Sequence, residues 1–294
     1  MSTFVQLVFA GLALGCIYAL VALGFTIIFK ASEVINFAQG EFLLVGAYVA
    51  SAGFIDWHLN FFVAVILAII ITVLVALAFE RFALRRMIGR PVFTIVMITI
   101  GLDIILSTGV VVIWPQGNRS PATPFQIQSG INYGGVHFGA NDLWTIAITI
   151  LVCAALYVFF RYTRYGLAMR ATALDQEAAL AMGINIRVVY ALAWGIAAAI
   201  ATIGGIFLAI SETTFDAGLG GIALVAFPAI ILGGLDSIPG AVVGGIVIGL
   251  TEELTQGYVN LGVNFYTIAP YILMILVLLV RPYGLFGSRK VERV

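Results

Sequence analysis

Charge is scarce in this chain of 294 residues, which holds only 14 Lys and Arg and 14 Asp and Glu, or 10% charged residues, with a formal net charge of zero. A soluble globular domain is nearer to a quarter charged. Hydrophobic residues instead make up 62% of the chain, and apolar runs long enough to cross a bilayer as helices recur from one end to the other. We therefore interpret the sequence as a polytopic α-helical membrane protein rather than a soluble protein with an apolar core.

Cysteine and histidine are rare as well, with two of each. Cys16 and Cys153 fall within apolar runs, and His58 and His137 fall in loops, at no spacing typical of a set of metal ligands. We therefore expect neither a disulfide nor a metal site.

Catalytic groups are also missing. The sequence shows no paired carboxylates and no Ser/His/Asp set in a pattern typical of an active site. A P-loop needs a Gly-Lys pair to hold phosphates, but the only lysines, Lys30 and Lys290, follow Phe29 and Arg289. We therefore expect a chain that is not an enzyme and binds no cofactor itself, so that any ATP-driven function would need an ATPase from another chain.

The apolar runs predict one membrane domain, residues 1–294, with about eight or nine transmembrane helices. They are continuously apolar rather than alternating, which disfavours spanning strands. The expected spans are residues 4–29, 38–54, 60–80, 92–114, 142–160, 188–210, 221–236, 239–256 and 265–281. The run at 221–236 is short and a turn rich in glycine joins it to the next, so either of the two could be a broken or re-entrant helix.

Lys and Arg are distributed unevenly about these spans. With nine spans, thirteen of the 14 fall on one side and only Arg119 falls on the other. The thirteen are Lys30, Arg81, Arg85, Arg86, Arg90, Arg161, Arg164, Arg170, Arg187, Arg281, Arg289, Lys290 and Arg293. Because cytoplasmic loops are enriched in these residues, we expect the N-terminus outside and the C-terminus in the cytoplasm.

Residues 115–141 then form an exterior loop, which Pro115, Pro121 and Pro124 stiffen. Residues 125–128 and 136–138 nearly alternate on either side of a glycine-containing stretch, which predicts a small hairpin. The loop could receive a partner or be a plain connector.

Pairs of glycines four residues apart recur within the spans, a spacing that lets helix backbones approach closely. The pairs are Gly11 with Gly15, Gly240 with Gly244, and Gly245 with Gly249. We expect them to pack helices within the bundle.

Glu252 and Glu253 lie late in the eighth span. They either bond to neighbouring helices or reach the outer interface.

Polar residues also occur at expected membrane depth, where each must be hydrogen-bonded or face water. Thr99, Asp103 and Ser107 recur every four residues, so they should line one face of the fourth span. Three more begin the second span around Gly40: Asn36, Gln39 and Glu41. The six predict either a translocation path or contact with another membrane chain, the alternative being ordinary hydrogen bonding between helices.

A polar segment, residues 161–187, separates two apolar runs and carries four arginines. Within it, Glu177, Ala178, Ala179 and Gly183 have the spacing of the EAA-type motif of ABC-transporter permeases, in which a short helix fits a groove on a cytoplasmic ATPase. The alanines would permit close docking, Glu177 and the arginines Arg164 and Arg170 would form ion pairs, and Gly183 would permit the turn back to the membrane. A solvated amphipathic connector is the alternative.

Four motifs, one of them in this segment, resemble in order and along almost the whole chain those of the permeases of branched-chain amino-acid ABC importers. They are residues 34–41 with 46–48, residues 164–171 through 181–185, residues 233–241, and residues 281–287. The chain departs from the family pattern at Gln39, where His is common, and at Asp236, where a second small residue is common. Because it begins directly at its first span, it looks like the shorter of the two permease types.

The resemblance implies a bacterial or archaeal cytoplasmic membrane and several partners. These are a second related permease, two cytoplasmic ATPases, an extracytoplasmic binding protein that delivers the substrate, and the lipid bilayer, with no nucleic acid. Related permeases also serve urea, short amides and aromatic acids, so these remain alternatives to an amino acid. A stand-alone channel or ion-coupled carrier is the competing class, although it would not need the segment at 161–187.

Overall fold

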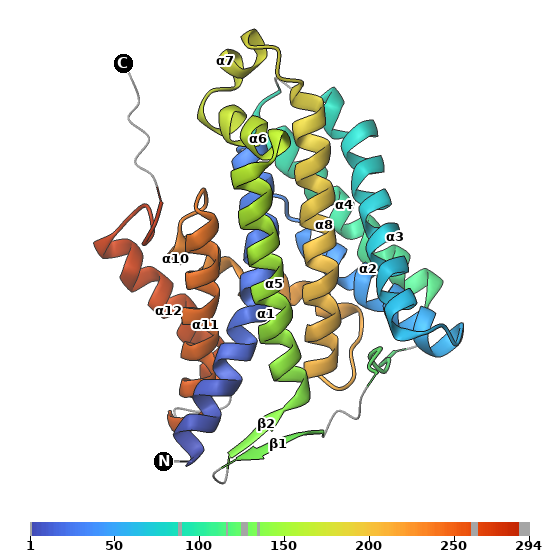
Figure 1. Ribbon diagram of the computed structural model, residues 1–294, viewed down its shortest axis with the longest axis vertical. Coiled ribbons are helices and arrows are strands. Elements are labelled where there is room, and N and C mark those ends of the chain that lie inside the picture. Colours follow the sequence, from blue (N-terminus) through green and yellow to red (C-terminus); the bar gives the residue numbers. More distant parts are fainter. Residues whose placement is uncertain are drawn as a thin grey trace.

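The computed structural model describes residues 2–87, 90–115, 117–124, 129–133, 136–259 and 264–287, which form a helical bundle with one small hairpin (Figure 1). The longer helices are α1 (Ser2–Ser32), α3 (Phe61–Phe82), α4 (Val92–Ile113), α5 (Ala140–Tyr162), α8 (Ile186–Ser211) and α11 (Ile238–Tyr258). The shorter ones are α2 (Gln39–Ser51), α6 (Arg164–Leu174), α7 (Gln176–Ala181), α9 (Ile222–Val225), α10 (Phe227–Gly233) and α12 (Phe265–Val280). Three further helical turns are η1 (Ala52–Asp56), η2 (Leu84–Arg86) and η3 (Ala217–Gly221).

Among the described residues, the six longer helices have the length and composition to cross a membrane. The shorter α2, the segment 217–233 and α12 correspond to the remaining expected spans, so the prediction of eight or nine is roughly compatible with the structure. The segment 217–233 is broken into η3, α9 and α10, with Pro228 in the first turn of α10. The prediction of a broken helix in this part of the chain is confirmed.

The bundle has two distinct ends (Figure 1). The N-terminus and the strands lie at the hairpin end, whereas α6 and α7 project at the other, which we call the α6–α7 end. The segment after α12 returns to the α6–α7 end, where Leu285 and Phe286 donate backbone hydrogen bonds to Leu232 and Gly233 at 2.8 and 3.0 Å. The nine predicted spans likewise put the connections of the hairpin end on one side of the membrane and those of the α6–α7 end on the other.

The centre of the bundle is formed by α1 and α8, in which 83% and 72% of the most apolar stretch is buried. For α3, α4 and α5 the share is only 17–22%, so these helices expose apolar faces. Such faces fit contact with lipid or with another membrane chain.

The two strands, β1 (Gly130–Tyr133) and β2 (Val136–Gly139), pair antiparallel with Gly130 opposite Gly139. The hairpin agrees with the prediction in its second strand. Its first strand is 130–133, later than the predicted 125–128, which lies outside the described residues. Phe9 of α1 packs edge-on against Phe138 at 4.7 Å, so the hairpin rests on the start of α1.

Arg119 ties the loop before the hairpin to the bundle. Its side chain is 8% exposed, forms an ion pair with Asp56 at 2.6 Å and donates to the Ser51 hydroxyl at 3.2 Å. Its backbone exchanges two hydrogen bonds with Phe215, at 2.7 and 2.9 Å. A buried charge needs such partners, so Arg119 fixes where this loop, the end of α2 and the link after α8 meet.

Candidate functional site

After α1 the chain turns back into the bundle before α2 begins. Glu33 adopts a left-handed conformation with φ 57°, and residues 34–38 are not helical. The fully buried Asn36 holds this stretch, because its side-chain oxygen accepts from the Ala38 amide at 3.1 Å and its nitrogen donates to Gln39 at 3.4 Å. Non-helical backbone at membrane depth occurs where protein or a water-filled cavity satisfies it.

We call residues 34–38, together with the first turn of α2, the polar loop. Gln39 shows how deep in the bundle this loop lies. Its side-chain nitrogen donates to the Ala197 carbonyl at 3.2 Å, and Ala197 is near the middle of the 26-residue α8. The same amide packs against Gly24 of α1, where a side chain would collide with it. The start of α2 therefore lies well inside the bundle, between its two most buried helices.

Glu41, in the first turn of α2, is 5% exposed, and one of its carboxylate oxygens has no hydrogen-bond partner among the described residues. The other contacts Gly220 of the broken segment, and Gly40 packs against the carbonyl of the same glycine. A short helix that begins inside the bundle and a broken helix thus meet around a buried carboxyl group. In membrane transporters, discontinuous helices of this kind form substrate and ion sites near the middle of the bilayer.

The polar face of α4 joins this loop in part. The fully buried Thr99 accepts a hydrogen bond from the Phe37 amide at 3.3 Å and donates to Val96 at 2.8 Å. Asp103, half-buried one turn further, lies within electrostatic range of Glu41. Ser107 donates to Ile104 of its own helix at 3.4 Å, and within the described residues the structure does not join it to the loop.

The segment between α5 and α8 forms two short helices rather than one. Thr163 caps α6 by accepting from Gly166 at 3.0 Å, and Asp175 caps α7 by accepting from Ala178 at 2.9 Å. Gly183 then takes φ +83°, a conformation that suits glycine, before Asn185 caps α8. Sequence spacing located the segment, and the cap at Asp175 divides it.

The predicted ATPase-coupling residues face different ways. Arg164, Arg170, Glu177, Ala178 and Gly183 are exposed, whereas Ala179 is only 4% exposed and packs inside the segment. Three apolar side chains that the motif does not contain are exposed instead: Leu174 at 89%, Leu180 at 56% and Met182 at 83%. Apolar side chains that cap a projecting helical tip are typical of a contact surface, and their exposure depends on the break at Asp175.

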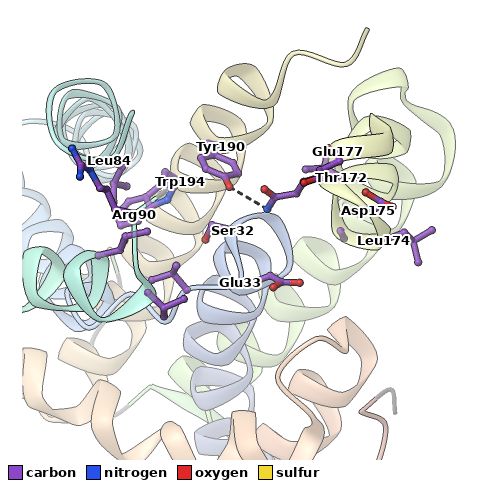
Figure 2. Close-up of a pocket in the computed structure, with 15 residues that line it drawn as sticks. Ser32, Glu33, Leu84, Arg90, Thr172, Leu174, Asp175, Glu177, Tyr190 and Trp194 are labelled. Atoms are coloured by element: carbon purple, nitrogen blue, oxygen red, sulfur yellow. Dashed lines mark hydrogen bonds between the residues drawn. The ribbon is translucent and has the colours of Figure 1, made fainter. Parts of the chain in front are cut away.

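A cavity of about 410 Å³ separates part of this segment from the bundle (Figure 2). Its walls come from the end of α1, the start of α4, the first turns of α8 and residues 172–177. Gln176 donates to the Tyr190 hydroxyl across it at 3.2 Å, the hydrogen bond dashed in Figure 2. Because Val34, Ile95 and Trp194 also line it, the cavity leads from the segment toward the polar loop.

The chain is similar to known transport permeases along nearly its whole length. The family model for the permease component of branched-chain amino acid transport systems matches residues 7–278. The high-affinity branched-chain amino acid transport system permease protein LivH of Salmonella typhimurium is 34% identical, over 99% of this chain and 98% of its own. LivH of Escherichia coli is 33% identical and BraD of Pseudomonas aeruginosa 32%, with the same coverage.

Among solved structures, PsaBC from Streptococcus pneumoniae has a TM-score of 0.50 at 14% identity, over 96% of this chain and 92% of its own. That likeness concerns the fold alone. The family model and the curated relatives span nearly the whole length, and the chain belongs to the family of branched-chain amino acid transport system permease components.

Proposed function

We propose that this chain is a permease subunit of an ATP-driven importer, and that it forms a translocation path for branched-chain or other amino acids together with a second permease. The observation that carries the proposal is the projecting α6–α7 segment, with its capped helices, exposed Glu177 and arginines, and exposed apolar tip. The chain lacks the Gly-Lys pair of a P-loop, so separate ATPases would supply the energy.

The proposed orientation places the α6–α7 end in the cytoplasm and the hairpin end outside. Of the 14 Lys and Arg residues, three (Arg289, Lys290 and Arg293) lie outside the described residues, which leaves eleven. Ten of these eleven lie toward the α6–α7 end and Arg119 toward the hairpin end, an asymmetry that supports this orientation. A bacterial or archaeal cytoplasmic membrane follows from the need for cytoplasmic ATPases.

The polar loop and α4 would border the path. A passing amino acid carries an ammonium group, for which the carboxyl oxygens of Glu41 and Asp103 are hydrogen-bond acceptors, and Asn36, Gln39 and Thr99 offer further polar contacts. These contacts must be weak and exchangeable, because tight binding in a permease would trap the substrate. Substrate choice would be set chiefly by an extracytoplasmic binding protein, so a related substrate such as urea, a short amide or an aromatic acid remains the alternative.

Co-purification with an ATPase tests the proposal. We expect the tagged chain, expressed with the ATPase subunits of its transporter, to retain them in detergent. Leu180→Asp with Met182→Asp should remove the ATPase without impairing membrane insertion. The matched control is Ile131→Asp, which changes a residue that is 61% exposed at the hairpin end and should leave retention unchanged.

Transport by the chain alone would contradict the proposal. If liposomes containing only this chain took up amino acids, a stand-alone channel or carrier would be the better description. If the complete complex took up substrate only with ATP and the binding protein, the ligand of that binding protein would identify the substrate.

A further inference from the structure

A second cavity lies on the outer surface of the bundle, away from the polar loop. Helices α5 and α11 flank α1 (Figure 1), and a groove of about 540 Å³ runs between them. Its floor includes the buried Leu23 of α1. The apolar residues of its walls are Cys153, Leu156 and Phe160 on α5, and Ile238, Pro239, Val242 and Val243 on α11.

The groove extends from the α6–α7 end toward the middle of the bilayer. Its deepest residue on α5 is Cys153 and its last is Arg161, eight residues or about 12 Å of helix. Half of a hydrocarbon core of about 30 Å is of similar depth. The groove therefore corresponds to one leaflet, which is the cytoplasmic one in the orientation proposed above.

Two arginines border the groove at its α6–α7 end: Arg161 in the last turn of α5 and Arg170 on α6. Both are exposed, and within the described residues neither forms an ion pair. Arg161 donates to the Tyr157 hydroxyl at 2.8 Å and lies over the rings of Tyr157 and Tyr162, at 5.7 and 5.8 Å. Tyrosines and arginines in this arrangement are typical of the headgroup region.

We propose that this groove binds an anionic phospholipid, with an acyl chain along the apolar walls and the phosphate at Arg161 and Arg170. An apolar groove with two arginines at its rim matches the two parts of such a lipid, since basic pockets between helices on the cytoplasmic side bind anionic headgroups. Arg170 also lines a smaller neighbouring pocket with Glu33 and Asp236. A transmembrane helix from another chain would need to bring carboxylates to the same rim. Because Arg170 belongs to α6, the bound headgroup would also attach the α6–α7 segment to the bilayer.

Native mass spectrometry of the purified full chain tests the site. The detergent-solubilised protein is titrated with phosphatidylglycerol and, separately, with phosphatidylcholine of the same acyl composition. We expect tighter binding of phosphatidylglycerol, and Arg161→Gln with Arg170→Gln should weaken it about thirtyfold, as removal of two basic residues beside an anionic surface implies. Arg187→Gln is the matched control, because Arg187 lies toward the same end but does not line the groove.

A second variant tests the apolar part without altering charge. Val242→Trp should fill the groove and lower phosphatidylglycerol binding, whereas Leu151→Trp, at a position on α5 that is 63% exposed and outside the groove, should not. Equal binding of the two lipids by the unmodified chain, or equal loss in the paired arginine variants and in Arg187→Gln, would overturn the proposal. So would a disulfide cross-link from Val243→Cys to a second permease chain in membranes, which would make the groove a protein interface.

Discussion

At the scale of single residues, the contact between α1 and α11 depends on the absence of side chains. Gly249 packs directly against the backbone of Gly15, and Gly245 packs against Ala19. Beyond this stretch, Tyr18 donates to Glu252 at 2.7 Å. The expectation that glycine pairs pack helices within the bundle is confirmed for these residues, and Glu252 is bonded to another helix rather than extended to the interface.

Replacement of Gly249 by alanine should therefore destabilise the protein. The new methyl group would meet the Gly15 backbone, and overpacking of this kind costs about 1–3 kcal/mol. The matched control is Gly109→Ala in α4, where nothing lies within 4 Å of the added carbon and helix propensity favours alanine. Thermal unfolding followed by size-exclusion chromatography should show a lower Tm only for Gly249→Ala.

Asp103 is the charged residue on the polar face of α4. In hydrocarbon an unpaired carboxylate would cost at least about 2.5–3.5 kcal/mol, so its half-buried position near Glu41 indicates protein or water rather than lipid. We expect Asp103→Asn to assemble but to transport more slowly, and Asp103→Leu to impair assembly, transport or both. Thr108→Ala, at an exposed position of the same helix, is the control. Normal uptake and assembly by Asp103→Leu would exclude Asp103 from the path and from any permease interface.

At the scale of elements, local caps and a glycine turn define the α6–α7 segment. Side-chain caps fix the start of each helix, Gly183 makes the return turn, and the cavity behind the segment is crossed by the hydrogen bond from Gln176 to Tyr190. In the proposed importer, closure of an ATPase would act first on this segment.

Gly183→Pro and Glu177→Lys should uncouple ATP hydrolysis from uptake. Proline fixes φ near −65°, which is incompatible with the +83° that Gly183 adopts. Glu177→Lys reverses a charge on an exposed surface, and Glu177→Gln is its conservative control. The readouts are ATPase activity and substrate uptake of the reconstituted complex. Tight coupling retained in both Gly183→Pro and Glu177→Lys would show that the segment does not transmit closure.

The sequence predicts the elements better than their interruptions. Apolar run lengths placed the ends of the simple helices to within about three residues, because desolvation in a bilayer acts on every residue of a span. The break at Asp175 was not predicted, and neither was the depth in the bundle of the connection before Gln39. They depend on side-chain caps and on contacts with residues distant in sequence, such as Gly220 and Ala197.

At the scale of the whole molecule, the orientation can be tested with two cysteines in a background that lacks Cys16 and Cys153. Asn118→Cys lies on the loop held by Arg119, and Met182→Cys lies at the tip beyond α7. We expect an impermeant maleimide added to intact cells to label the first and not the second. After the cells are permeabilised, both should be labelled. The reverse pattern in intact cells would show the opposite topology, with the α6–α7 segment outside the cell and out of reach of cytoplasmic ATPases.

The candidate site shows the same limit of sequence reasoning as the elements. Asn36, Gln39 and Thr99 are polar residues at expected membrane depth, and the structure links Asn36 to Gln39 directly and joins Thr99 to the loop through Phe37. Ser107 shared the same periodicity, yet it bonds within its own helix. Periodicity identifies a helix face, but it does not show how far along that face a neighbouring element extends.

The pairing of α1 with α11 also has a consequence for biogenesis. Tyr18 and Glu252 are 234 residues apart, so the ribosome releases the first helix long before its closest partner exists. During most of synthesis the glycine face of α1 lies in the membrane without α11. A chain that stops before α11 therefore lacks the contact that closes the bundle, and the cell's quality-control proteases meet an incomplete protein whatever the state of its other helices.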